Sequence, residues 1–262
     1  VKNLFDLAGT VTVAGSKINR DRPPATEDAT AVERRRRAGA VCLGALNMGE
    51  YAYDFVTENA HDGATRNPRD LARSAGGSSG GSSAAVAAGL VPFSLGTDTN
   101  GSIRVPSSFC GLWGLKPTYG RLSRAGSFPF VDSLDHIGPF ARSVADLAAT
   151  YDAMQGADPR DPACAQRPVE PALPALDSGH GGLRVAILGG YFEKNCPPPA
   201  HCAVAAVASV LGSSRRVELP EPACARAAAY VITASEGGRL HLENLKKRAA
   251  DFDPGTRDRF LA

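Results

Sequence analysis

The stretch GGSSGGSS at residues 76–83 constrains this chain more than any other feature. Such Gly/Ser runs usually form flexible linkers. This one, however, runs directly into an apolar segment, residues 84–95, that has the pattern of a helix followed by a strand. A phosphate-binding loop would need a lysine after its last glycine, and none follows here. A role in a catalytic centre is the third interpretation, and it needs support from elsewhere in the chain.

The composition is that of an ordinary globular protein with a sizeable core. The chain has 262 residues, of which 43% are hydrophobic and 21% charged, and its net charge is +2. This balance does not favour direct binding to nucleic acid or to a membrane surface. The longest mostly apolar stretch, residues 84–95, is too short to span a membrane. Together with the lack of an apolar leader at Val1–Asp6, these features predict a cytoplasmic protein.

The cysteines give no sign of a metal site or of a disulfide framework. Six cysteines are spread along the chain without CxxC spacing. This spacing suggests neither a zinc site nor a dense disulfide framework. Both ends look cut, because Val1 enters in mid-strand without an initiator Met and the helical pattern of residues 239–262 has no closing signal. We expect the chain to be part of a longer protein.

Strand and helix patterns alternate along the chain, which predicts an α/β fold around a mixed sheet. The expected elements are a helix within 31–40 that stops at Gly39, a strand at 40–48, a polar loop at 56–75, a helix at 82–89, a strand at 91–99, an apolar run at 110–115, a helix at 143–155 with Ser143 as its N-cap, a strand at 183–190, and helices at 200–212 and 222–248. The four arginines at 34–37 are expected to form a solvated helix face, although one of them should point toward the core.

A second small, polar loop, GTDTNGSIR at residues 96–104, lies at the end of the predicted strand 91–99. Chemistry in α/β proteins is commonly found at such strand ends. The N–H groups around Asn100 and Gly101 could form a nest for an oxyanion, with Ser102 as the nucleophile. A serine nucleophile needs a base, and the five histidines form no obvious triad. Lys2 is the alternative base, provided that burial or a nearby cation lowers its pKa.

These motifs resemble the amidase signature family. The resemblance rests on GGSSGGSSAAVAAG, GTDTNGSIRVPSSFCGLWGLKPTYGRLSRAG and SLDHIGPFARSVADL, and it covers nearly all of the first 155 residues. It implies an α/β/α sandwich around a mixed twisted sheet, incomplete at both ends. It also implies a single domain over 1–262, with the signature core at 1–155 and a surface connection at 157–182.

The resemblance further implies a Ser–cisSer–Lys triad made of Lys2, Ser78 and Ser102. Ser102 would attack the amide, Ser78 would pass the proton onward, and neutral Lys2 would receive it. The mechanism that the resemblance implies requires no metal and no organic cofactor. The backbone N–H groups of Thr99, Asn100, Gly101 and Ser102 would form the oxyanion hole. The remaining predicted site residues have supporting roles: Ser79 through hydrogen bonding, and Asp98 and Arg104 by bracing the loop.

Two branches of the family compete for the substrate. The loop GTDTNGSIRVP, with Asn100 where the A subunits of the amidotransferases usually carry glycine, looks more like the amidohydrolases of s-triazine breakdown. Those enzymes act on 1-carboxybiuret or similar ureido acids. The alternative is the A subunit of a glutamyl-tRNA amidotransferase, which is a glutamine amidase. A third interpretation, from another class, is an inactive scaffold fragment. A small accessory subunit or a homo-oligomer is compatible with either enzyme.

An acidic substrate would need cationic or hydroxyl partners. The segment 234–248 offers Arg239, His241 and Arg248 for this purpose. The same segment can equally form a solvated helix face, and we favour that interpretation.

Overall fold

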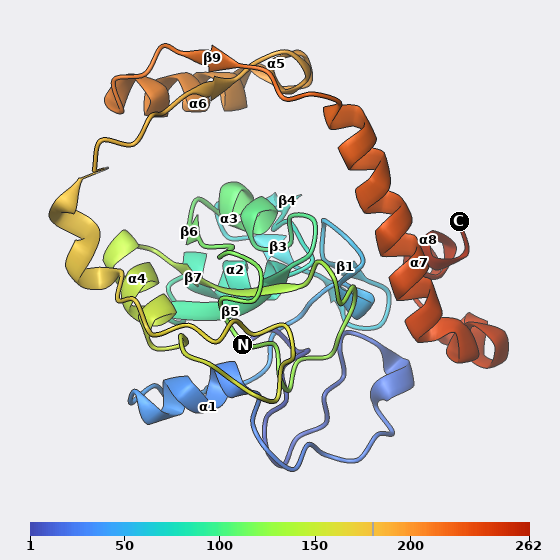
Figure 1. The fold of residues 1–262 in the computed structure, drawn as a ribbon. Helices are drawn as coiled ribbons and strands as arrows, with labels where there is room; N and C mark the ends of the chain where they lie inside the picture. Colours follow the sequence, from blue (N-terminus) through green and yellow to red (C-terminus); the bar gives the residue numbers. More distant parts are fainter. Residues whose placement is uncertain (180) are drawn as a thin grey trace. The chain divides into compact units, whose positions relative to one another are not determined.

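The computed structural model describes residues 1–179 and 181–262, which form two compact units (Figure 1). Unit 1 comprises Val1–Leu176 and Thr233–Ala262, and unit 2 comprises Asp177–Ile232. The single domain expected over 1–262 stays a prediction. Residue 180, inside the predicted connection 157–182, lies outside the described residues.

Unit 1 contains both the Gly/Ser run at 76–83 and the polar loop at 96–104. Its helices are α1 (Thr30–Arg37), α2 (Gly80–Ala87), α3 (Arg104–Cys110), α4 (Val144–Asp152) and α8 (Pro254–Leu261), with short 3-10 turns at Lys17–Asn19, Glu50–Ala52, Leu173–Ser178 and Ala249–Asp251, of which the third crosses the unit boundary. Its strands are β1 (Glu58–Asn59), β2 (Gly63–Ala64), β3 (Arg66–Asn67), β4 (Asp70–Ser74), β5 (Phe93–Asp98), β6 (Trp113–Gly114) and β7 (His136–Ala141). Unit 2 has β8 (Ile187–Leu188), α5 (Tyr191–Lys194), α6 (Pro198–Val210) and β9 (Arg216–Val217). Helix α7 (Pro222–Arg248) has residues in both units.

The sheet beneath the site has the strand order β5-β7-β6, and both of its pairs are antiparallel. Helix α2 packs on β5, and α4 packs on β7. One face of the sheet contributes Phe140 to a small core with Val86 and Ile103, while Leu95 and Ile137 belong to the main core with Leu4 and other N-terminal residues. Residues 94–98 of β5 are accordingly all buried, although only one of them, Leu95, has a large apolar side chain.

Several predicted elements have nearly the expected bounds. Helix α4 begins after Ser143, whose hydroxyl accepts a hydrogen bond from the amide of Asp146, as the sequence pattern predicted. Helices α2 and α6, strand β5 and helix α7 also match their predicted ranges closely. The α/β class is confirmed, although the sheet in unit 1 is antiparallel and the parallel pair β8–β9 lies in unit 2.

Three of the predictions were wrong in detail. Residues 40–48 do not form a strand, because only Leu46 makes a bridge, with Lys2, and Val41 and Leu43 are exposed. The predicted loop 56–75 contains two short antiparallel hairpins, β1–β2 and β3–β4. The predicted strand 183–190 shortens to β8, because its ladder with β9 pairs two residues.

The arginine run of α1 is not simply a solvated face. Arg35 is buried, and its guanidinium lies 4.1 Å from the centroid of the Phe93 ring. Arg34 donates hydrogen bonds to the carbonyls of Met154, Gly156 and Ala157. The core-facing arginine is therefore accommodated by a cation–π contact, while its neighbour caps the chain that follows α4.

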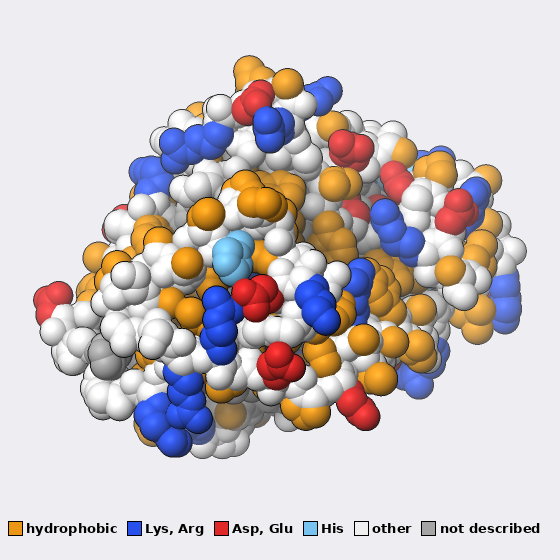
Figure 2. All heavy atoms as spheres, turned by 90° about the horizontal axis from the view of Figure 1, so that it is seen from above, with side chains coloured by type: hydrophobic (Ala, Val, Ile, Leu, Met, Phe, Trp, Pro, Cys, Tyr) orange, Lys and Arg blue, Asp and Glu red, His pale blue; other side chains and the backbone are white. Residues whose placement is uncertain are grey.

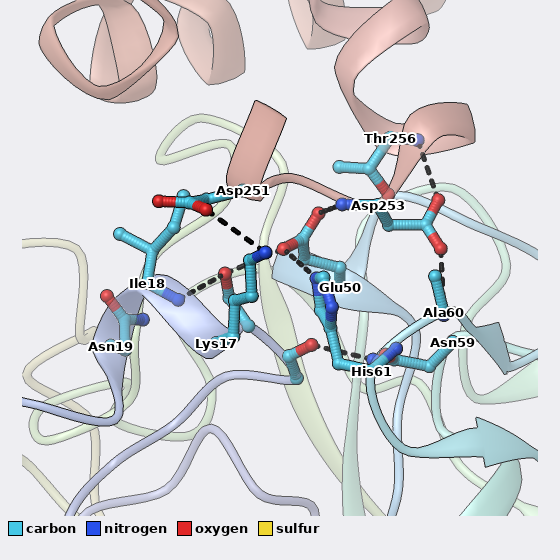
Figure 3. A network of polar contacts seen from close by, with 12 residues as sticks. Lys17, Ile18, Asn19, Glu50, Asn59, Ala60, His61, Asp251, Asp253 and Thr256 are labelled. Atoms are coloured by element: carbon cyan, nitrogen blue, oxygen red, sulfur yellow. Dashed lines mark hydrogen bonds and ion pairs between the residues drawn. The ribbon is translucent and has the colours of Figure 1, made fainter. Parts of the chain in front are cut away.

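A buried polar network ties the start of α8 to the core of unit 1 (Figure 3). The Glu50 carboxylate accepts hydrogen bonds from the Ser16 hydroxyl at 2.6 Å and the Asp253 amide at 2.7 Å, and it lies 3.0 Å from His61 Nε2. Asp253 in turn accepts hydrogen bonds from the amides of Ala60 and Thr256. Since Glu50 is buried, these partners satisfy a carboxylate that would otherwise be costly to bury.

Basic and acidic side chains are interspersed among hydrophobic ones on the face shown in Figure 2. Among the described residues, no helix is both long enough and apolar enough to cross a bilayer.

Candidate active site

Lys2 is completely buried, although it is only the second residue of the chain. Its backbone is held between two segments, because its amide donates to the Leu95 carbonyl at 3.0 Å and it forms a parallel bridge with Leu46. Its Nζ donates hydrogen bonds to Ser78 Oγ and to Thr97 Oγ1, each at 2.8 Å. The long flexible side chain is thus fixed by two hydroxyls in a water-excluded position.

Burial changes the chemistry of this amine. Desolvation lowers the pKa of Lys2 from 10.5 to about 7, while the carboxylates of Asp54, Asp135 and Asp98 oppose the shift. A substantial fraction of Lys2 is therefore neutral near neutral pH, and a neutral amine can accept a proton. The sequence analysis required such burial if Lys2 is to act as a base, but the sequence alone could not show it.

The Gly/Ser run forms a tight turn that enters α2. The Gly77–Ser78 peptide bond is cis, and Ser78 and Ser79 are both fully buried. Ser79 Oγ donates to the Thr97 carbonyl at 3.2 Å and accepts from the Thr97 amide at 3.3 Å, so it fastens the turn to β5. A Cβ at Gly96 would lie 2.7 Å from Ser79 Oγ, so this close approach requires glycine on the strand.

Asp98 organises the loop that carries Ser102. Its carboxylate forms a bidentate pair with Arg104, with both N–O distances 2.9 Å, and also accepts from the amides of Gly101, Ile103 and Arg104. These contacts hold the pKa of Asp98 below its usual value, although burial opposes them. With its acceptor positions occupied, Asp98 is arranged to hold the loop rather than to exchange protons.

Ser102 itself is buried at the N-terminal side of α3. No hydrogen bond joins its hydroxyl to Ser78, or to any other group, in the part of the chain that the structure describes. The structure therefore brings Lys2 and Ser78 together, while the second link of the predicted triad is not present as a hydrogen bond.

The predicted oxyanion hole needs one adjustment. The Gly101 amide donates to Asp98 Oδ1 at 2.7 Å, so it is already occupied. The candidate donors in this conformation are consequently the amides of Thr99, Asn100 and Ser102. An oxyanion would have to compete with a carboxylate for the fourth amide, and we expect it to lose.

Side chains outside the predicted set hold this loop in position. Thr99 Oγ1 donates to Asp135 Oδ1 at 2.6 Å, and Asn100 Nδ2 donates to Thr233 Oγ1 of α7 at 2.8 Å. Asp135 also accepts from the amides of Phe130 and Val131, and burial raises its pKa. Thr97 and Asp135 lie within the quoted motifs and Thr233 lies outside them, but only their three-dimensional contacts reveal what these three residues do.

Two of the three basic residues considered for an acidic substrate, His241 and Arg248, have other contacts. His241 is buried in an aromatic cluster, with its ring centroid 3.9 Å from that of Tyr51, and burial lowers its pKa to about 4. Arg248 pairs with Asp251, and Arg239 is exposed. His241 is therefore neither part of a solvated face nor a cation. Within residues 1–179 and 181–262, no cluster of three or more His, Cys, Asp or Glu side chains could hold a metal ion.

The family model described as Amidase matches residues 1–261. The chain belongs to the amidase family. Over its whole length it is 60% identical to AtzE, a component of the 1-carboxybiuret hydrolase of Pseudomonas sp. strain ADP, and it spans 57% of that protein. It is 40% identical to the A subunit of a glutamyl-tRNA(Gln) amidotransferase from Roseiflexus sp. strain RS-1, of which it spans 58%.

Solved amidase structures agree with this assignment. One, described as a vestigial protein complex that reveals the evolutionary origins of an s-triazine catabolic enzyme, matches with a TM-score of 0.98 and 60% identity over 99% of this chain and 57% of that chain. A 6-aminohexanoate cyclic dimer hydrolase complexed with substrate matches with a TM-score of 0.84 and 34% identity, over 99% of this chain and 58% of that one. This amidase chain thus spans a little over half the length of the relatives it matches.

Proposed function

We propose that the protein is an amidohydrolase that cleaves a C–N amide bond through an acyl-enzyme on Ser102. The observation that carries the proposal is the buried Lys2–Ser78 hydrogen bond, at 2.8 Å, beside a lysine whose pKa burial lowers to about 7. A buried lysine of this kind is uncommon in a purely structural position, because burying an amine is costly unless it has a function or a counter-charge.

In the proposed mechanism, Ser102 Oγ attacks the amide carbonyl. Its proton passes to Ser78 Oγ, while the proton of Ser78 passes to Nζ of neutral Lys2. The carbonyl oxygen becomes an oxyanion, which the amides of Thr99, Asn100 and Ser102 stabilise. The Lys2 proton then returns through Ser78 to the leaving nitrogen, and ammonia or an amine departs. A water molecule then attacks the acyl–Ser102 ester and gives its proton through Ser78 to Lys2. The proton returns to Ser102 Oγ as the acid is released.

For this relay, the Ser102 hydroxyl must turn toward Ser78 when substrate binds. Catalytic hydrogen bonds are often long or misaligned without substrate and tighten in the Michaelis complex. Asp98 and Arg104 brace the loop, and Ser79 fixes the turn that carries Ser78.

We propose a small ureido acid such as 1-carboxybiuret as the substrate. The support is the 60% identity to a component of a 1-carboxybiuret hydrolase, against 40% to the A subunit of an amidotransferase, each over the whole chain. Because AtzE is named as one subunit of its enzyme and one matching structure is described as a complex, we further propose that the protein works with a small accessory subunit or as a homo-oligomer.

The test is ammonia release by the full-length protein from glutamine, biuret, 1-carboxybiuret, allophanate and an aryl amide. We expect turnover of a ureido acid that is lost in Ser102→Ala and retained in Ser108→Ala, which changes an exposed serine of α3. Turnover of glutamine would favour the amidotransferase alternative. If no amide is cleaved, the proposed function is contradicted and the scaffold interpretation stands.

A further inference from the structure

Asp54 is a buried carboxylate that the proposed mechanism does not use. It lies between the turn Glu50–Ala52 and β1, and it is 8% exposed. Its Oδ1 atom has no hydrogen-bond partner among the described residues. An unpaired oxygen on a buried carboxylate is unfavourable, so such an atom in a native structure calls for an explanation.

The Asp54 side chain packs against the backbone of the turn that carries Ser78. A Cβ at Gly77 would lie 2.6 Å from Asp54 Oδ1, and a Cβ at Gly49 would lie 2.2 Å from the same atom. The Gly49 amide also donates to the Ser78 carbonyl at 3.2 Å. Glycine at 49 and 77 thus lets the carboxylate approach the Gly77–Ser78 bond, with no side chain in between.

The charges around this carboxylate connect it to Lys2. Of the carboxylates that raise the Lys2 pKa, Asp54 has the largest effect, ahead of Asp135 and Asp98. Burial raises the pKa of Asp54 to about 6, and the positive charges of Lys2 and Arg259 oppose this effect, while Asp253 adds to it. With a pKa of about 6, Asp54 is still mostly ionised at neutral pH, so its negative charge favours the protonated form of Lys2.

We propose that Asp54 is a positioning residue of this site. Its carboxylate, which packs against the Gly77–Ser78 backbone, is the counter-charge that stabilises the protonated form of Lys2. In this way Asp54 sets the pH at which Lys2 loses its proton and can act as a base through Ser78. This inference rests on the proposed function, because it concerns the same relay. The residue that would adjust the pH dependence of the relay thus lies outside both the Gly/Ser run at 76–83 and the loop at 96–104.

The expected direction follows from the charges. Ionised Asp54 stabilises the Lys2 ammonium, so its removal favours the neutral amine at lower pH. Asp54→Asn should therefore move the midpoint of the activation of Ser102 to lower pH, by at least about half a pH unit. Below about pH 6, where Asp54 is itself protonated, the profiles of the wild type and the variant should converge.

The experiment measures the rate at which a fluorophosphonate labels Ser102 in the full-length protein, as a function of pH. This readout needs no identified substrate. Three variants accompany the wild type: Asp54→Asn, Asp54→Glu, which keeps the charge, and Asp132→Asn, which changes an exposed carboxylate with an 84% accessible side chain. We expect the midpoint to fall in Asp54→Asn and to stay near the wild-type value in the other two.

An unchanged midpoint in Asp54→Asn, with the wild type labelled normally, would overturn this inference and leave the proposed function intact. If Ser102 of the wild type is not labelled at any pH, the proposed function fails and the inference fails with it. Asp54→Ala is the second uncharged variant, in case Asp54→Asn does not fold. Failure of both to fold would make Asp54 purely structural, which also contradicts the proposal.

Discussion

Lys2 Nζ lies 2.8 Å from Ser78 Oγ, and neither residue is accessible to solvent. The two are 76 positions apart in the sequence and meet because the first residues of the chain lie beside Leu95 at the centre of β5. The amine is also held by Thr97 on the same strand. A base that is fixed on two sides loses little entropy when it accepts a proton, which suits it to a relay.

The first prediction concerns pH. Only neutral Lys2 can accept a proton, and burial lowers its pKa to about 7. The value of kcat/KM should therefore rise with pH and level off above an inflection near pH 7. Steady-state kinetics between pH 5 and 9 would check this. Lys2→Arg should lack the rising limb and most of the activity, since a guanidinium stays protonated; an inflection that persists in this variant would assign it to another group.

The second prediction concerns stability. Lys2 has a pKa of about 7 in the folded chain and an ordinary 10.5 when unfolded, so the unfolded state binds more protons between these values. The free energy of unfolding should rise with pH through this window. Lys2→Met abolishes the titration, so the free energy of unfolding of this variant, relative to that of the wild type, should be higher at pH 6 than at pH 9 by about 3 kcal/mol. Denaturant unfolding at both pH values measures the difference; equal effects would mean that Lys2 is not buried as described.

The third prediction separates the two serines of the Gly/Ser turn. Ser78→Ala removes the group that joins the base to the nucleophile and should lower kcat by about 10²–10⁴-fold. Ser79→Ala loses hydrogen bonds to the backbone of Thr97 and should lower kcat by no more than about tenfold, with lower thermal stability. Turnover and melting temperature of both variants give the comparison. A larger kinetic effect at Ser79 would reverse the assigned roles.

The fourth prediction concerns the contact between Asn100 and α7. Asn100 Nδ2 donates to Thr233 Oγ1 at 2.8 Å, so Thr233 helps to set the conformation of the proposed oxyanion loop. Thr233→Val removes the acceptor and keeps the volume. We expect a loss of kcat of about tenfold with a smaller change in KM, because the loop acts in the transition state. Thr233→Ser keeps the hydroxyl and should retain activity. If KM alone changes, the contact serves substrate binding instead.

The sequence was informative where function depends on local pattern. The Ser143 cap, the bounds of α2, α4 and α6, and the two serine loops could be predicted, because glycine, serine and apolar spacing determine local backbone geometry. The prediction of a strand at 40–48 was wrong because it rested on a run of apolar residues, and such a run indicates only a tendency to be buried. Val41 and Leu43 are 81% and 76% exposed, and a strand also needs a neighbouring strand to pair with.

The rest of the site depends on contacts over long sequence distances. Thr97 reaches Lys2 across 95 positions, and Asn100 reaches Thr233 across 133. Thr97 lies in the GTDTNGSIR loop, but its pattern does not show that the side chain contacts Lys2, and nothing local distinguishes Asp54 from an ordinary loop aspartate. The occupied amide of Gly101 was also beyond the sequence pattern, since it depends on where the Asp98 carboxylate points.

The central claim is that Ser102 carries the acyl group. The most direct measurement is rapid quenching of the full-length protein during turnover of an amide, followed by mass spectrometry. Ser78 and Ser102 lie between Arg73 and Arg104 with no basic residue in between, so trypsin leaves them in one peptide that must be fragmented. We predict a substrate-derived acyl group on Ser102 that is absent in Ser102→Ala. An acyl group on Ser78, or turnover that persists in Ser102→Ala, would contradict the account.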